Sequence, residues 1–273
     1  MLNRYTFIDE ELAENLIHQS YNSNLIKNGD CINKFYSVKN YIVIHKQNIP
    51  LADHSTLPTT EYYYEVMVEI MKLYEKGVFI EPILGYSINE QTIKTIENST
   101  DVQAKGYVIL AKQTGEPLYK YDKIPNPFSN EKILETKKTE YLLNTLTNIS
   151  NIPQAHYDKF AEDLLKIMNA NLNFDAYNQE NIIYNKNKGF IFTNINHKLS
   201  NFKAKEEFDK CFIRNCFALC CINFDFTKSI SDTDKNTLKQ LNSIIYDKCV
   251  KSLIRLNIDD DLIQKHSLNI WKI

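Results

Sequence analysis

The pattern of apolar residues changes once along this chain of 273 residues, at the Pro-containing connector "DKIPNPFSN" (122–130). Before the connector, alternation of apolar and polar residues indicates strands, with two helical runs among them. After it, the spacing is helical except for one short hairpin. Segregated strands and helices predict an α+β chain. We expect a β-rich N-terminal lobe with a leading helix over residues 1–118 and a helical C-terminal lobe over 119–273.

Local signals place the expected elements. Asp9 is a suitable N-cap for a helix over 10–21, and a longer helix begins near Thr59 or Thr60 and closes at Gly77. Two antiparallel strands flank a turn at residues 39–40. A further strand occupies 78–88, a polar excursion follows over 89–104, and 105–121 is a strand followed by a turn. Helices are expected over 130–149, 153–170, 203–222 and 231–256.

Composition restricts the kinds of partner. Formal net charge is −2 with both signs scattered along the chain, which argues against nucleic acid as a partner. No run approaches the roughly 18 apolar residues of a membrane span. The N-terminus lacks a basic start followed by an apolar block, so we expect no signal peptide and a cytoplasmic protein. Delivery into a host cell stays open.

Four of the six cysteines cluster in "CFIRNCFALCC" (211–221). Cys216 and Cys220 are four apart and could share one helix face. No further His or Cys pair completes a tetrahedral metal site, so buried thiols in a reducing compartment are the simpler interpretation.

Phosphoryl transfer from a nucleotide needs a cation on the phosphates, a carboxylate near the attacking hydroxyl and oxygen ligands for a metal. The strand "YIVIHK" ends in Lys46, and alternation places Ile42, Ile44 and Lys46 on one face. The apolar residues of such a strand could form the floor of an adenine pocket, and its lysine could place an ammonium group near the phosphates. A solvated lysine at a strand end is the alternative.

The long helix supplies acidic partners for this lysine. Glu69 is preferred because the residue one turn later is Leu73, which can pack into the lobe. Glu65 is the second choice, since Glu69 at the equivalent place would bury a charge. The alternative is a row of solvated glutamates.

The segment "GYVILAKQTGEPL" (106–118) describes a buried strand that ends in a loop. Its exit at residues 111–113 could hold an adenine ring through backbone N–H and C=O groups, and Gly115 allows a tight turn. An ordinary strand exit would look the same.

The segment 173–198 offers metal and base candidates. Asp175 precedes Asn181 by six positions, a hairpin of 182–184 and 190–192 follows, and Asn194 comes just after its second strand. Asp175 could orient a hydroxyl while Asn181 and Asn194 face a metal from neighbouring strand ends. The alternative is a hairpin with polar ends in an Asn-rich chain. The nearby "HYDKFAED" (156–163) has helical spacing and predicts a packing helix with a solvated face rather than a catalytic loop.

The order of these pieces resembles the protein-kinase-like fold over roughly residues 25–225, and 156–196 looks like the catalytic region of divergent bacterial members. The resemblance implies a two-lobed kinase-like fold that uses ATP with Mg²⁺ or Mn²⁺ and acts on a protein. Its carried-over roles are the phosphate-anchoring Lys46, its partner Glu69, the gatekeeper Leu110, the hinge Ala111 to Gln113, the catalytic base Asp175, and the metal positions Asn181 and Asn194.

The sequence also departs from that pattern. Asn194 stands where the principal metal carboxylate is expected, and "KNGDCINKF" (27–35) keeps a single glycine for the phosphate-covering loop. The pair before Asp175 is not His-Arg, its distance from Asn181 is one residue longer than usual, and no Ala-Pro-Glu follows. The leading interpretation is a divergent kinase with a weakened metal site. A pseudokinase that works by binding is nearly as well supported, and a small-molecule kinase or an unrelated α+β protein are further alternatives.

Overall fold

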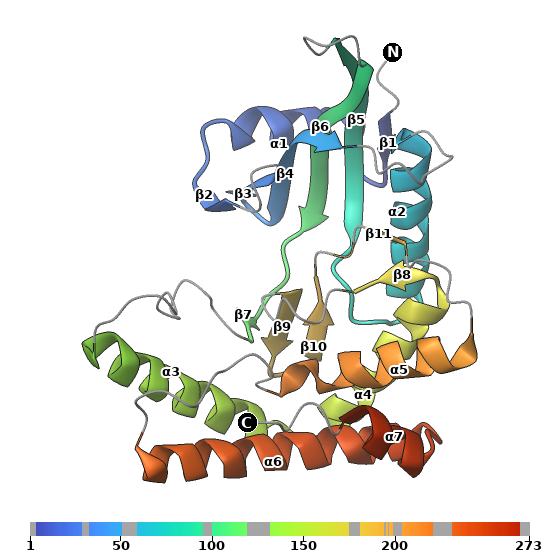
Figure 1. Ribbon diagram of the computed structural model, residues 1–273. Helices are drawn as coiled ribbons and strands as arrows, with labels where there is room; N and C mark the ends of the chain where they lie inside the picture. Colours follow the sequence, from blue (N-terminus) through green and yellow to red (C-terminus); the bar gives the residue numbers. More distant parts are fainter. Residues whose placement is uncertain are drawn as a thin grey trace. The chain divides into compact units, whose positions relative to one another are not determined.

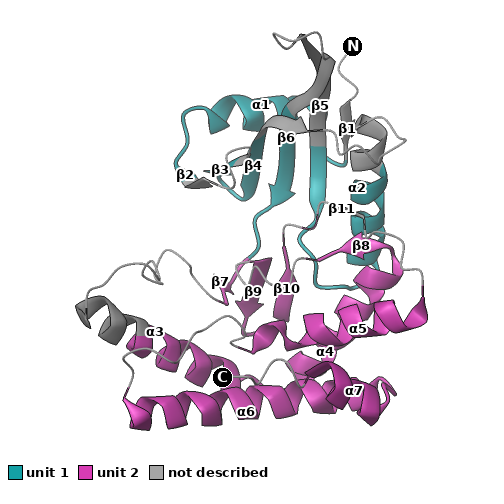
Figure 2. Cartoon of the chain, viewed as in Figure 1, with its two compact units in different colours: residues 1–113, 196–198 teal, residues 114–195, 199–273 magenta. Residues whose placement is uncertain are grey.

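The computed structural model of the chain describes residues 4–28, 33–50, 59–94, 100–118, 132–174, 181–193, 195, 197–198, 204–220 and 231–267. The chain divides into two units, residues 1–113 with 196–198 (unit 1) and residues 114–195 with 199–273 (unit 2) (Figure 2). The first unit carries a large sheet and the second is mainly helical, so the predicted α+β composition is confirmed. The predicted lobe boundary after residue 118 stays a prediction.

The sheet of unit 1 has six antiparallel strands in the order β1-β5-β6-β4-β3-β2 (Figure 1). Its strands are β1 (Arg4–Thr6), β2 (Leu25–Asn28), β3 (Asn33–Val38), β4 (Tyr41–Pro50), β5 (Ile83–Lys94) and β6 (Thr100–Ala111). The paired strands of the predicted turn at 39–40 are β3 and β4. Strand β6, in the middle of the sheet, is hydrogen-bonded to both β4 and β5. This pairing fixes the position of Ala111, where the chain leaves the sheet.

The polar segment 89–104 differs from expectation. Strands β5 and β6 extend into it from either side as a paired ribbon, in register from Asn89 opposite Lys105 to Lys94 opposite Thr100. Antiparallel strands satisfy each other's backbone groups whatever their side chains, so a polar segment can still form a ladder. Apolar alternation alone therefore underestimated the length of both strands.

Helix α1 (Glu10–Ser20) lies over the sheet and begins as predicted. The Leu12 N–H donates to Asp9 Oδ1 at 3.1 Å, which is an N-cap hydrogen bond. Ala13 and Leu16 of the helix are buried with Val43 and Ile109 of the sheet. This apolar cluster is the core between the helix and that face of the sheet.

A buried polar contact also joins α1 to the sheet. His45 Nε2 lies 2.6 Å from Ser20 Oγ, and the Ser20 hydroxyl donates to the Ile17 carbonyl at 2.6 Å. Because that hydroxyl proton is already used, Ser20 Oγ accepts a hydrogen bond from the Nε2–H of a neutral His45. Burial, reinforced by the charge of Lys34, lowers the pKa of His45.

Helix α2 (Thr59–Glu75) also belongs to unit 1 and contacts β5 and the short β11 (His197–Lys198). Gly77 has φ +78°, and the Val78 N–H donates back to the Leu73 carbonyl at 3.0 Å. This is the C-terminal closure that the glycine predicted.

Unit 2 contains α3 (Lys132–Ser150), α4 (Gln154–Asn169), α5 (Lys205–Cys216), the 3₁₀ helix η3 (Phe217–Leu219), α6 (Asp232–Arg255) and α7 (Asp260–Ser267). Its strands are β7 (Glu116–Pro117), β8 (Leu172–Asn173), β9 (Ile182–Asn185) and β10 (Gly189–Phe192). A three-stranded sheet runs in the order β10-β9-β7. Phe160 of α4 stacks on Phe192 of β10 with ring centroids 4.8 Å apart, so this helix and the hairpin share one core.

The predicted packing helix at 156–163 is confirmed as part of α4, but its acidic side chains are not a solvated face. Asp163 is 1% exposed and pairs with Lys159 Nζ at 2.5 Å. Asp158 accepts hydrogen bonds from Ser252 Oγ at 2.8 Å and Arg255 Nη1 at 2.6 Å, both on α6. Buried carboxylates need such partners, and helical periodicity does not reveal them.

The cysteine stretch is also shorter as a helix than expected. Helix α5 ends at Cys216 and a 3₁₀ turn follows, so Cys216 and Cys220 do not lie on one α-helical face. Both thiols are buried, as predicted, and so is Cys249 of α6. Within the part of the chain that the structure describes, no three His, Cys, Asp or Glu side chains group as a metal site. Over the same residues, no helix has the length and apolar character needed to cross a membrane.

Candidate functional site

The hairpin predicted at 182–192 is formed by β9 and β10, with Ile182 opposite Phe192 and Asn185 opposite Gly189. Its turn is held by Asn185, whose Oδ1 accepts from the N–H groups of Asn187 at 2.9 Å and Lys188 at 3.0 Å. Gly189 has φ +100°, a conformation that favours glycine. The sequence "NKNKG" therefore makes the turn that sets the register of both strands.

This hairpin fixes the surroundings of Asn181. The residue is 2% exposed, and its carbonyl accepts from the Thr193 N–H at 2.9 Å. Thr193, the residue before position 194, therefore lies beside Asn181. Asp175 and Asn194 themselves lie outside the described residues. A joint metal site of Asn181 and Asn194, with Asp175 as base, stays a prediction.

The segment after the strand exit packs closely on the hairpin. Gly115 has φ +138°, and a Cβ on it would lie 2.6 Å from the Tyr184 carbonyl oxygen and 2.7 Å from Ile183 Cγ2. Leu118 N–H donates to the Ile182 carbonyl at 2.8 Å. Gly115 is therefore required for close approach of two backbones, a stronger constraint than the tight turn that the sequence suggested.

Asn185 makes a second connection that the sequence analysis missed. Its Nδ2 donates to both the carbonyl and the Oγ1 of Thr114 at 3.0 Å. One amide side chain thus organises its own turn through Oδ1 and holds the neighbouring segment through Nδ2. An Asn at the end of a strand was the available signal, but the abundance of Asn in this chain masked it.

The predicted hinge begins at Ala111, the last residue of β6. Leu110, in the gatekeeper place, is 6% exposed and lies opposite Ile42 and Ile83 in the sheet. The Ala111 N–H donates to the Pro82 carbonyl at 3.2 Å, and Gln113 Nε2 donates to the Ala111 carbonyl at 2.9 Å. An adenine amino group would use the second lone pair of that carbonyl or replace the Gln113 amide.

The Lys46 and Glu69 positions both belong to unit 1. Lys46 lies in β4 opposite Asn33 and Gly106, and its side chain is outside the described set. Glu69 accepts a hydrogen bond from Lys72 Nζ at 2.8 Å on its own helix, while Leu73 is buried as expected. An ion pair between Lys46 and Glu69 stays a prediction.

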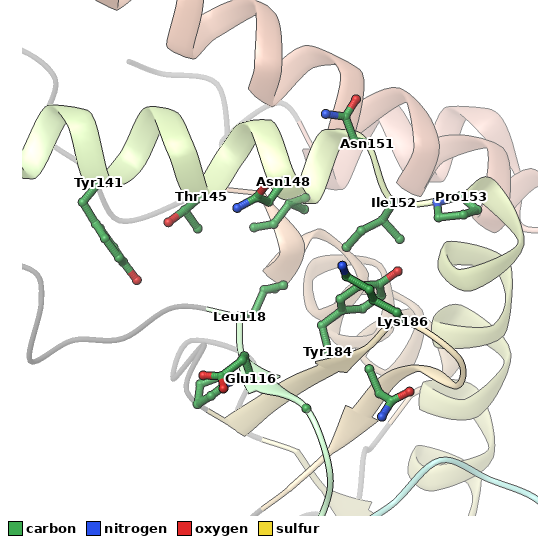
Figure 3. A pocket seen from close by; sticks show the side chains of 14 residues that line it. Glu116, Leu118, Tyr141, Thr145, Asn148, Asn151, Ile152, Pro153, Tyr184 and Lys186 are labelled. Carbon is green, nitrogen blue, oxygen red and sulfur yellow. The ribbon is translucent and has the colours of Figure 1, made fainter.

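Unit 2 contains a pocket of about 850 Å³ that the sequence analysis did not identify (Figure 3). Its walls come from α3, the α3–α4 connection, the edge strand β7 and the end of β9. The lining residues are Gly115, Glu116, Pro117, Leu118, Tyr141, Thr145, Asn148, Ile149, Asn151, Ile152, Pro153, Tyr184, Asn185 and Lys186. The available signal was the spacing of Tyr141, Thr145 and Asn148, which places them on one helix face.

Tyr184 forms the wall of this pocket opposite α3. Its Oη lies 3.1 Å from His156 Nδ1, and burial raises the pKa of its phenol. The neutral phenol and the amides of Asn148 and Asn151 give the pocket polar groups without net charge. Leu118, Ile149 and Ile152 supply an apolar floor.

No protein-family model matches the chain, and no curated protein sequence matches it. Among solved structures, it aligns with a Toxoplasma gondii specific rhoptry antigen kinase domain at TM-score 0.39 and 8% identity, covering 90% of this chain and 81% of that one. It also aligns with ROP2 from Toxoplasma gondii, described as a virulence factor with a protein-kinase fold and no enzymatic activity, at TM-score 0.40 and 8% identity, over 90% and 80% of the two chains.

A third alignment is with a ROP18 kinase domain in complex with AMP-PNP and sucrose, at TM-score 0.39 and 8% identity, covering 91% of this chain and 82% of that chain. At this level of similarity, the alignments do not assign the chain to a family.

Proposed function

We propose that this protein is a divergent, ATP-binding kinase-like phosphotransferase that acts on a protein hydroxyl. In this proposal Lys46 neutralises phosphate charge with Glu69 as its partner, and the exit from Leu110 to Gln113 receives adenine. Asp175 orients the accepting hydroxyl. These assignments rest on the residue pattern of the sequence.

The observation that carries the proposal is the hydrogen bond from the Thr193 N–H to the Asn181 carbonyl at 2.9 Å. It supports the expectation that the two ends of the β9–β10 hairpin present neighbouring side chains. Asn181 and Asn194 would offer amide oxygens, which suit a hard cation such as Mg²⁺ or Mn²⁺. Neither brings a negative charge, so metal affinity would be low and transfer slow.

A second candidate is a pseudokinase that binds a protein partner without transferring phosphate. The observation that favours it is the amide at position 194, where the kinase-like pattern has a carboxylate. Nucleotide binding without a metal requirement would agree with this candidate.

Thermal shift with ATP, with and without Mg²⁺ or Mn²⁺, tests the nucleotide site. We expect ATP to raise the melting temperature of the wild-type protein and Lys46→Ala to lose this rise. Lys76→Ala is the matched control, because Lys76 is an exposed lysine just after α2. If no nucleotide shifts the wild-type protein, the ATP-site proposal is wrong.

Transfer itself is tested with radiolabelled ATP. Asn194→Asp should increase metal-dependent autophosphorylation, since it restores a charge at the metal position, and Asp175→Ala in the same background should abolish it. If ATP binds but Asn194→Asp gives no transfer, the pseudokinase is the better description.

A further inference from the structure

The unit 2 pocket, called the groove below, is lined by one acidic and one basic side chain, those of Glu116 and Lys186 (Figure 3). Glu116 and Tyr141 lie toward one end, and Lys186 and Pro153 lie toward the other. Leu118 lies between these ends, under α3. A ligand that follows the groove would meet a carboxylate first, then an apolar floor, then an ammonium.

The wall along α3 presents hydroxyl and amide groups. Tyr141, Thr145 and Asn148 recur at helical spacing, and Asn148 and Asn151 each carry both a donor and an acceptor. From Tyr141 to Asn148 the helix rises by about 10 Å, at 1.5 Å per residue. This equals the length of roughly three residues of extended peptide.

The opposite wall is the open edge of a sheet. Among the residues that the structure describes, β7 pairs with β9 alone in the order β10-β9-β7, and Leu118 N–H is directed to β9. Antiparallel alternation therefore turns the Pro117 carbonyl away from β9, toward the groove. Pro117 has no N–H, so this edge offers an acceptor and no donor.

The charges in the groove do not suit a phosphate-bearing ligand. Lys186 is the single cation among the lining residues that the structure describes, and Glu116 is the single carboxylate among them. Lys248 on α6 does not add a cation to the groove. Its Nζ donates to the carbonyls of Ser150 and Ile152, at and just after the end of α3, at 2.6 and 2.5 Å. A ligand with both charges and a backbone of alternating donors and acceptors matches the lining better.

We propose that this groove binds a short extended peptide segment of a partner protein, with an apolar side chain on the floor formed by Leu118, Ile149 and Ile152. A basic side chain of the peptide lies at the Glu116 end and an acidic one at the Lys186 end. Peptide N–H groups donate to the Pro117 carbonyl and to the amide oxygens of Asn148 and Asn151. The site goes beyond nucleotide binding and needs neither ATP nor phosphoryl transfer.

The test titrates the full ¹⁵N-labelled protein with blocked pentapeptides and follows amide shifts. The probes are Lys-Ala-Leu-Ala-Glu, its reverse Glu-Ala-Leu-Ala-Lys, and the uncharged Gln-Ala-Leu-Ala-Gln. We expect one charged order to shift the amides of Gly115, Thr145 and Lys186 and to bind about three-fold or more tightly than the uncharged peptide, which is the size of an exposed ion pair. Glu116→Lys should remove this preference.

Thr145→Trp fills the groove and should abolish the shifts at Gly115 and Lys186. Thr147→Trp is its matched control, because Thr147 is exposed on the other face of the same helix and should leave binding unchanged. The proposal is overturned if no peptide shifts these amides, or if Thr145→Trp binds the peptides as well as Thr147→Trp does. Maltose serves as an uncharged ligand rich in hydroxyl groups, and the proposal is also overturned if maltose shifts the amides and the peptides do not. A failed ATP shift would leave these results unaffected, so the two proposals fail separately.

Discussion

At the scale of single residues, the backbone conformation at Gly115 is the strongest constraint next to the candidate site. Its φ of +138° is a conformation that residues other than glycine rarely adopt, and an added Cβ would lie 2.6 Å from the Tyr184 carbonyl oxygen. A flexible side chain could move aside, but the Tyr184 carbonyl is held in the β9 strand. Substitution must therefore displace the segment from the hairpin.

We expect Gly115→Ala to lower the free energy of unfolding by about 2 kcal/mol or more, from left-handed strain and the clash together. Gly77→Ala is the matched control, since φ there is +78° but nothing lies within 4 Å of the added Cβ. It should cost about 1 kcal/mol. Urea unfolding followed by circular dichroism measures both, and equal losses would refute the close-approach argument.

His45 is the residue whose titration should affect unit 1. Its pKa in the folded state is lowered from 6.5, so folding favours the neutral ring. The stabilisation is complete above about pH 6.5 and is lost as the pH falls through the folded pKa, because the unfolded chain binds the proton first. The tyrosines 21, 36 and 107 surround the ring and supply no negative charge to offset protonation.

We therefore expect the melting temperature of the wild-type protein to fall more between about pH 7 and about pH 5 than that of His45→Gln, which can still donate to Ser20. His18→Gln is the control, because His18 is exposed on α1, the helix that also carries Ser20. If wild type and His45→Gln show the same pH dependence, the neutral-histidine assignment is wrong.

At the scale of elements, α4 and α6 are joined by a buried polar network rather than by apolar packing alone. Gln154 Nε2 donates to Asp158 Oδ1 at 3.0 Å and to the Lys248 carbonyl at 3.0 Å, and Arg255 completes the network from the end of α6. Burial alone would raise the pKa of Asp158, but the hydrogen bonds from Gln154, Ser252 and Arg255 lower it below its ordinary value.

Asp158→Asn should cost about 1–3 kcal/mol of stability near neutral pH, since a charged acceptor with several donors is lost. The folded pKa lies below 3.8, so the difference from wild type should persist above about pH 4 and shrink as the pH falls further. Asp247→Asn, at an exposed position of α6, is the control. A difference that is unchanged at about pH 2.5 would contradict this account.

The sequence predicted those elements that local rules determine. The N-cap at Asp9, the closure at Gly77 and the turn of the β9–β10 hairpin each depend on a few neighbouring residues, and each is confirmed. The buried role of Asp158 depends on residues more than 90 positions away, and the pocket depends on three separate segments. Such partners share no local pattern with the residues that they meet, so a single sequence does not reveal them.

The same reasoning applies to the candidate nucleotide site. The hairpin next to Asn181 followed from the sequence, and so did the apolar part of β6 that contains Leu110. The hydrogen bond from Gln113 to the Ala111 carbonyl did not, because a side chain that folds back onto the strand before it leaves no trace in periodicity.

At the scale of the whole molecule, the chain has two units, each with its own buried side chains. Leu16 is buried in unit 1 with Val43 and Ile109, and Leu253 is buried in unit 2. Units with separate cores can unfold as separate cooperative transitions.

We expect calorimetry to resolve two transitions. Leu16→Ala should lower one and Leu253→Ala the other, each by the effect of about 2–5 kcal/mol that is usual for a buried leucine. The two variants make the same chemical change, so each serves as the control for the other. A single transition that both variants shift equally would show that the units unfold together.

The order of strands in the large sheet has a consequence for self-association. Its outermost strands are β1, with three residues, and β2, with four residues and an irregular register between Leu25 and Lys27. Strand β6 is internal, since β4 pairs with it over residues 103–111 and β5 over 100–110, whereas β1 covers β5 only over residues 85–87. An unpaired edge is a template for strands of another copy, and short or bulged edges are poor templates. Of the two long strands, β6 is thus kept from edge-to-edge aggregation, while among the described residues β5 after residue 87 has a neighbouring strand on one side only.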